Sequence, residues 1–210
     1  MKDRVKRMIN EHNESAEMTE LRKLAIVDSE VESLINSIET SPLVNVVPVS
    51  FEAIEAVVLQ QVLAYWREMR MGARMSLMQN LDPVTMGRWL SHITIIEVQR
   101  DPLAFVYRLT GEKLETAHGT GIKGTDVRAI NDTVPGMGDT LHLMYKKVMG
   151  YENPVAFRGD LVVKNPSLKG IELLILPVSL EGEKVDRLMS VAHYYEHSLM
   201  PAGTTRLTWR

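Results

Sequence analysis

Residues 93–109 decide the fold of this chain, and they read ITIIEVQRDPLAFVYRL. β-Branched and aromatic residues are frequent in residues 93–98 and 103–109, as is typical of β-strands, and the QRDP segment between them is typical of a turn. In the second strand Phe105 and Tyr107 occupy alternate positions, so their side chains share one face. The stretch therefore predicts a β-hairpin near the middle of the chain.

Three further strands are expected after this hairpin, in residues 155–164, 171–178 and 185–195. The first alternates apolar with polar residues, whereas residues 171–178 are nearly all apolar, which indicates a central, buried strand. Turn-forming residues at 165–167 and 181–184 join the three strands.

Apolar residues repeated every three or four positions predict helices on both sides of the hairpin. The longest precedes it, at residues 50–71, with Ser50 at its start and Gly72 after its end. Its expected buried stripe consists of Phe51, Ile54, Val58, Val62, Tyr65 and Met69. Shorter helices are expected at residues 112–118 and 139–148. Helices and antiparallel strands thus occur in separate runs, which predicts an α+β fold.

The order of these elements resembles that of PAS domains, and several short motifs strengthen the resemblance. They are Tyr65-Trp66-Arg67, Asp82-Pro83, Tyr107-Arg108-Leu109-Thr110-Gly111, Gly121 and Gly124 ahead of Asp126, and Leu176-Pro177-Val178. Taken together they are similar to one bacterial stand-alone PAS subfamily, over residues 55–197.

The resemblance implies a five-stranded antiparallel sheet with short helices cupped over one face. In such domains the cup holds a small ligand or haem, or is filled by side chains, while the other face or the N-terminal helix makes dimer or partner contacts. The candidates for the ligand pocket of this chain are Tyr107, Leu109, His118, Phe157, Leu161 and Leu176. Which of them face the cup depends on strand register, because a slip of one residue reverses every side chain.

His118 is the pocket candidate that could bind a metal cofactor, because haem iron accepts an imidazole ligand. A lone histidine is more often a surface or hydrogen-bonded structural residue, so we predict no cofactor. The sequence holds no cysteine, which excludes disulfides, thiolate metal sites and cysteine-linked chromophores.

An N-terminal helical arm is expected before the PAS-like domain. Its apolar residues follow heptad spacing, so the arm either pairs with a second copy as a parallel coiled coil or packs on its own domain. These dimer or partner candidates are Leu24, Val27, Val31, Leu34 and Ile38. Pro42 ends the arm, because proline disfavours helix in the residue before it. We assign residues 1–48 to the arm and a linker, 49–198 to the PAS-like domain and 199–210 to a C-terminal tail.

The composition is that of an ordinary globular protein, with 45% hydrophobic and 24% charged residues among 210. A net charge of −3 gives no general attraction for nucleic acid. The apolar runs are far shorter than the roughly 20 residues of a membrane span, and the N-terminal residues lack a signal-peptide pattern. We therefore expect a cytoplasmic protein that binds neither nucleic acid nor membrane.

Two motifs could indicate an enzyme. GTGIKG at residues 119–124 has the spacing of a dinucleotide-binding loop, but a helix precedes it where a strand is required, so its glycines more plausibly allow a positive φ in a tight loop. HYYEH at residues 193–197 matches a zinc-peptidase pattern that requires a helix. The residues before it predict a strand, on which the two histidines would stand about 13 Å apart, so we expect no metal site.

We therefore predict a stand-alone PAS-type sensory or adaptor module of bacterial signal transduction, and not an enzyme. It would act as a homodimer, through a small-molecule ligand, through contact with an unidentified signalling protein, or through both. Two alternatives stay open, namely a small-molecule enzyme that uses the cup and a ligand-free dimerisation module.

Overall fold

The structure is a computed structural model that describes residues 44–199. The five apolar residues of the expected arm, Leu24, Val27, Val31, Leu34 and Ile38, lie outside the described residues, as does the tail from residue 200 onward. Whether the arm pairs with a second copy or packs on its own domain therefore stays a prediction.

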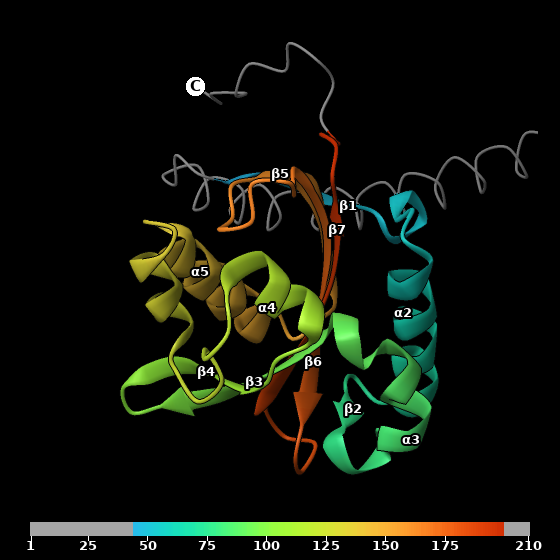
Figure 1. Ribbon diagram of the computed structural model, residues 1–210. Helices are drawn as coiled ribbons and strands as arrows, with labels where there is room; N and C mark the ends of the chain where they lie inside the picture. The colour runs from blue at the N-terminus through green and yellow to red at the C-terminus, as the bar shows by residue number, and fades with distance from the viewer. Residues whose placement is uncertain (1–43, 200–210) are drawn as a thin grey trace, which may run out of the picture. The chain divides into compact units, whose positions relative to one another are not determined.

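One sheet forms the centre of the described chain (Figure 1). Its strand order is β1 (Val44–Val49), β5 (Val155–Leu161), β6 (Gly170–Ser179), β7 (Arg187–Tyr195), β3 (Ile93–Arg100) and β4 (Leu103–Leu109). Neighbouring strands in this order are antiparallel, and a short β2 (Ser76–Leu77) pairs in parallel with β6. The five-stranded antiparallel sheet is confirmed in β3 to β7, and β1 and β2 are additions to it.

All of strand β1 except Val49 lies within the range that we assigned to the arm and linker. It pairs along its whole length with β5, from Val44 opposite Leu161 to Val49 opposite Ala156. The segment up to Pro48 was expected to be a linker, but proline is tolerated in an edge strand, and β1 is the edge of this sheet. The sheet therefore begins at Val44, and a domain that began at residue 49 would lose all of β1 except Val49.

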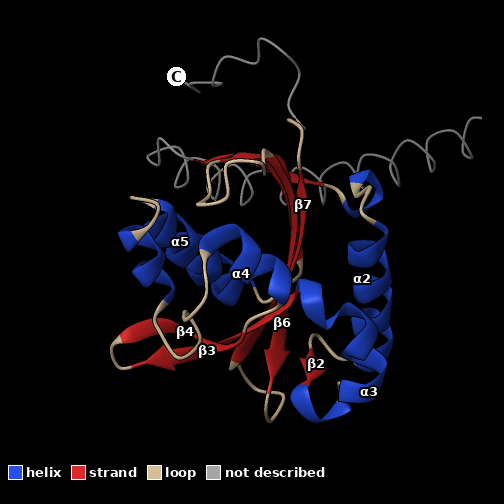
Figure 2. Ribbon diagram, in the orientation of Figure 1, coloured by secondary structure: helices blue, strands red, loops and turns tan. Residues whose placement is uncertain are grey.

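Helices cover both faces of the sheet (Figure 2). On one face lie α4 (Glu112–His118) and α5 (Met137–Tyr151), as expected for the cup, whereas α2 (Val57–Met69) packs on the opposite face of β6 and β7. The connections hold the short helix α3 (Pro83–Met86) and the 3-10 segments η1 (Phe51–Ala53), η2 (Met78–Asn80), η3 (Gly87–His92) and η4 (Val127–Asp132). In the centre of the sheet, α2 thus covers the face on which the resemblance to PAS domains implied dimer or partner contacts.

The buried side of α2 differs from the expected stripe. Its buried residues are Leu59, Val62, Leu63, Tyr65 and Trp66. Trp66 is 1% exposed, and its indole Nε1 donates a hydrogen bond of 3.0 Å to the carbonyl of Pro177 in β6. This bond ties the helix to the central strand.

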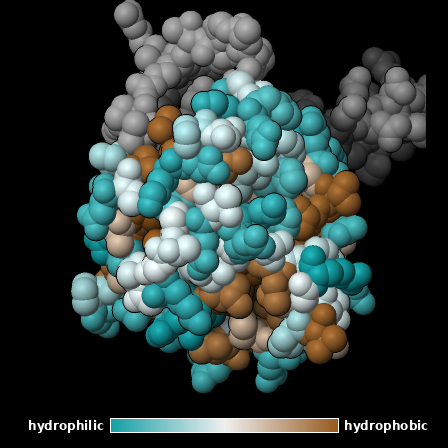
Figure 3. Space-filling model, viewed as in Figure 1, coloured by the Kyte–Doolittle hydropathy of each residue, from teal (hydrophilic) through white to brown (hydrophobic). Residues whose placement is uncertain are grey.

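The surface seen in Figure 3 is mostly hydrophilic, with several separate hydrophobic patches. No helix in residues 44–199 is both long enough and apolar enough to cross a membrane.

Candidate functional site

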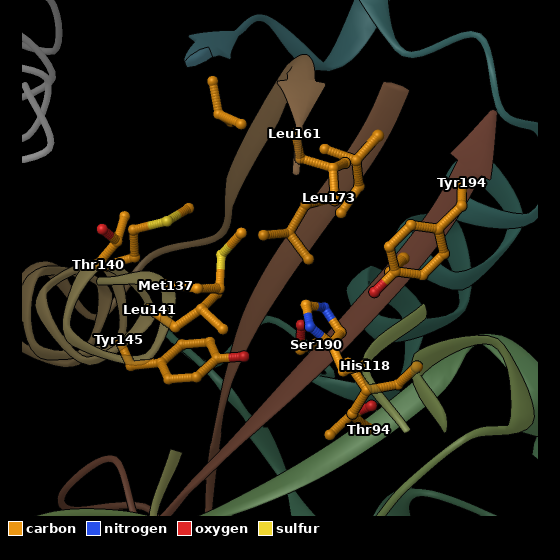
Figure 4. A pocket seen from close by; sticks show the side chains of 15 residues that line it. Thr94, His118, Met137, Thr140, Leu141, Tyr145, Leu161, Leu173, Ser190 and Tyr194 are labelled. Carbon is orange, nitrogen blue, oxygen red and sulfur yellow. The ribbon is translucent and has the colours of Figure 1, made fainter. Parts of the chain in front are cut away.

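A cavity lies between the sheet and helices α4 and α5 (Figure 4). It is partly open to solvent and offers about 40 Å³ of room for the centres of water-sized molecules. Its apolar wall consists of Val46, Leu114, Met137, Leu141, Met144, Leu161, Ile171, Leu173 and Ala192. The polar lining residues are Thr94, His118, Thr140, Tyr145, Ser190 and Tyr194.

Strand alternation places the sheet residues of this lining. In β7, Ser190, Ala192 and Tyr194 face the cavity, and the residues between them face the α2 side. In β6, Ile171 and Leu173 face the cavity in the same way. The floor of the cavity is thus built by the central strands, and α4 and α5 supply its roof.

His118 is the last residue of α4 and is 5% exposed. Its Nδ1 finds no hydrogen-bond partner among the described residues, although it is buried. Burial lowers the pKa of His118 to about 4. The ring meets Tyr194 edge to face, with 6.4 Å between centroids. The cavity therefore holds a neutral imidazole with an unpaired nitrogen.

The two tyrosines of the cavity are also neutral. Burial raises the pKa of Tyr145 to about 12, and a hydrogen bond from Ser190 opposes this shift. Burial and the nearby Tyr145 raise the pKa of Tyr194. No Asp, Glu, Lys or Arg of residues 44–199 lines the cavity, so the site carries no charge near neutral pH.

The pocket candidates from the sequence are distributed over three places. His118 and Leu161 line the cavity. Tyr107 and Phe157 are 1% exposed but stand outside its wall, and Leu109 is half-buried in β4. Leu176 faces the α2 side, because it alternates in β6 with residues on the cavity side. The expectation that Leu176 would face the cup is therefore corrected, and a ligand role for His118 and Leu161 stays a prediction.

A second polar cluster lies on the α2 face of the sheet, around Glu172 of β6. Glu172 is 1% exposed, and its carboxylate accepts hydrogen bonds from the backbone N–H of Ala56 at 2.7 Å, from that of Glu55 at 3.1 Å and from the Tyr195 hydroxyl at 3.1 Å. Arg158 donates to the same carboxylate through Nε at 2.9 Å and through Nη2. Burial alone would raise the pKa of Glu172, but the hydrogen bonds from Ala56 and Arg158 outweigh it and lower the pKa.

The two enzyme-like motifs adopt the expected conformations. Gly119, Gly121 and Gly124 all have positive φ, at 103°, 84° and 86°. The first three residues of the HYYEH motif are the last three of β7, which confirms the predicted strand up to Tyr195, and Glu196 and His197 follow its end. The ring centroid of Tyr195 lies 4.6 Å from that of His193 and 5.4 Å from that of His197. In the described part of the chain, no group of three or more His, Cys, Asp or Glu residues could hold a metal ion.

The sheet, the helical cup and the cavity between them are the architecture of a PAS-like α+β module. A family model described as PAS domain matches residues 54–192, and the chain belongs to this family. Strand β1 lies outside the matched residues. No curated protein and no solved structure matches the chain. PAS membership indicates a sensory or interaction module.

Proposed function

We propose that this PAS domain is a sensory or adaptor module of bacterial signal transduction and that its cavity binds a small molecule. The observation that carries the proposal is the unpaired Nδ1 of His118, 5% exposed, in the wall of a cavity. A buried polar atom without a partner costs about 1–3 kcal/mol, and a ligand that pairs with it recovers this cost. The signal would pass to a partner protein or change the oligomeric state.

Native mass spectrometry of the protein isolated from its own host tests this proposal. We expect a small-molecule adduct on the wild-type chain and its loss in Ala192→Leu, because Ala192 lines the cavity and a larger side chain would fill it. Ala64→Leu, at an exposed position of α2, is the matched control and should keep the adduct. No adduct on the wild type, or the same adduct on the wild type and on Ala192→Leu, would count against ligand binding in the cavity.

We propose no catalytic role for the cavity. Its polar residues include a histidine but no carboxylate that could orient it as a general base, among the lining residues that the structure describes. An enzyme that uses the cup would show turnover, and steady turnover that Ala192→Leu abolishes would replace the sensory proposal with the enzymatic one.

We also propose that the arm makes the protein a dimer, in the cytoplasm and without nucleic acid or membrane. Val31→Asp would place a charge in the apolar seam and should shift light-scattering mass toward that of a monomer. Ser33→Asp, at a position off the seam, is the matched control and should leave the mass unchanged. A chain of residues 44–210, which keeps β1, should be monomeric. If that shorter chain still has twice its own monomer mass, the arm is not the dimer element, and its apolar stripe packs on its own domain.

A further inference from the structure

The chemistry of the cavity lining restricts the ligand, and this inference rests on the proposed ligand-binding function. The lining residues carry no charge near neutral pH, since they include no Asp, Glu, Lys or Arg of the described chain and His118 is neutral. An ion taken from water into this space would lose its hydration without gaining a counter-charge, which costs several kcal/mol. The lining therefore disfavours anions and cations alike.

The polar and apolar parts of the lining lie on different strands. Thr94 of β3 and Ser190 of β7 are direct partners across the sheet, and His118 stands beside them in Figure 4. Toward the other side of the sheet, the lining from β5 and β6 is apolar, with Leu161, Ile171 and Leu173. The cavity thus has a polar end at Thr94, Ser190 and His118 and a mainly apolar end at β5 and β6, where the ring of Tyr194 lies opposite Ile171.

The polar end offers one buried nitrogen that is not already paired. Ser190 hydrogen-bonds to Tyr145, and the Thr140 hydroxyl donates to the carbonyl of Gly136 at 2.9 Å. His118 Nδ1 has no such partner in residues 44–199. A neutral imidazole has one donor and one acceptor nitrogen, so Nδ1 can pair with a ligand hydroxyl or, as a donor, with a ligand carbonyl.

The size of the cavity limits the ligand further. About 40 Å³ is a few times the roughly 10–15 Å³ that a single water requires by the same measure. A molecule held inside therefore has few non-hydrogen atoms, and a longer one must extend through the open side.

We propose that the cavity binds a short, uncharged aliphatic alcohol or ketone, whose oxygen pairs with Nδ1 of His118 and whose chain lies against Leu161 and Leu173. The polar group fixes the orientation of the molecule, and the aliphatic chain displaces water from the apolar end.

Three probes of four carbon atoms each, with different headgroups, test this proposal: 1-butanol, butanoate and n-butylammonium. Each is titrated at pH 7.5 into the full ¹⁵N-labelled chain and followed by NMR. We expect saturable shifts of the Ser190 and Ala192 amides with 1-butanol, and binding of both ions weaker by on the order of tenfold or more. The ¹⁵N resonances of the His118 ring should also move with 1-butanol.

His118→Phe should weaken 1-butanol binding about five-fold, the effect of one lost hydrogen bond. His142→Phe is the matched control, because His142 also has an unpaired Nδ1 but does not line the cavity. It should leave the binding unchanged. The ring resonances of wild-type His118 give the same information if His118→Phe fails to fold.

The outcomes separate this inference from the proposed function. Tighter binding of butanoate or n-butylammonium would overturn the ligand class but would keep the cavity as a binding site. If 1-butanol binds without shifting the His118 ring resonances, and if His118→Phe binds it as tightly as the wild type does, the assignment of Nδ1 is wrong. If none of the three probes saturates, the inference is wrong, and the adduct experiment alone decides the proposed function.

Discussion

Glu172→Ala should lower the free energy of unfolding by about 3–5 kcal/mol, the usual effect of removing one partner of a buried ion pair. The carboxylate is 1% exposed and holds the guanidinium of Arg158, which is 21% exposed. It also accepts from the backbone N–H groups of Glu55 and Ala56 just before α2. Without it, these two N–H groups lose their acceptor and the guanidinium loses its buried partner.

Urea unfolding at pH 7 measures the effect, and the melting temperature should fall by about 10 °C for a domain of this size. Glu55→Ala is the matched control, because Glu55 also contacts Arg158, at 3.1 Å, but its side chain is 70% exposed. An exposed ion pair contributes less than about 1 kcal/mol. Similar small losses for both variants would show that Glu172 does not hold α2 to the sheet.

The contribution of Glu172 also depends on pH. Its pKa in the folded protein is lowered from 4.5, so the folded state binds the proton less readily than the unfolded state. The stabilisation is therefore complete above about pH 4.5 and is lost as the pH falls through the lower folded-state pKa.

Most of the sheet could be predicted from the sequence because its signals are local. Alternation and turn residues placed the hairpin at 93–98 and 103–109, and the structure has β3 at Ile93–Arg100 and β4 at Leu103–Leu109. Strand β5 was predicted from alternation, β6 from a short apolar run between turns, and β7 from its β-forming residues after a turn. These patterns depend only on residues a few positions apart.

The orientation of β6 could not be predicted, because every residue from Gly170 to Ser179 is buried. A strand buried on both faces shows no alternation of polar and apolar residues, so its register is not visible in the sequence. Leu176 was therefore assigned to the wrong face. Tyr194 and Ser190 were missed as cavity residues, although regular alternation in β7 puts them on the same face as Ala192.

The start of α2 depends on a contact that no local pattern reveals. Phe51 and Ile54 fit a helical period, but the helix begins at Val57. The N–H groups of Glu55 and Ala56 donate to Glu172, more than a hundred residues further along the chain. The sequence alone cannot distinguish a helix whose first N–H groups donate to a distant carboxylate from a longer helix that Ser50 caps.

Between pH 7.5 and 4, the free energy of unfolding should fall by about 3 kcal/mol less in His118→Phe than in the wild type. The pKa of His118 is about 4 in the folded protein and 6.5 in the unfolded chain, so protons bind the unfolded chain first. Its contribution is fully present above pH 6.5 and is lost as the pH falls toward 4. A difference of two to three pKa units corresponds to about 3 kcal/mol.

Urea unfolding of the wild type and His118→Phe at pH 7.5, 6, 5 and 4 tests this expectation. The other titrating groups are common to both proteins, so the difference between their curves isolates His118. The wild type should lose about 3 kcal/mol more than the variant between pH 7.5 and 4. His142→Phe is the control. Burial also lowers the pKa of His142, but its side chain is only half-buried. The pH dependence of the unfolding free energy of His142→Phe should therefore be closer to that of the wild type than that of His118→Phe is. Parallel curves for the wild type and His118→Phe would mean that His118 is accessible to protons in the folded state, and the cavity would then accept charge at this position.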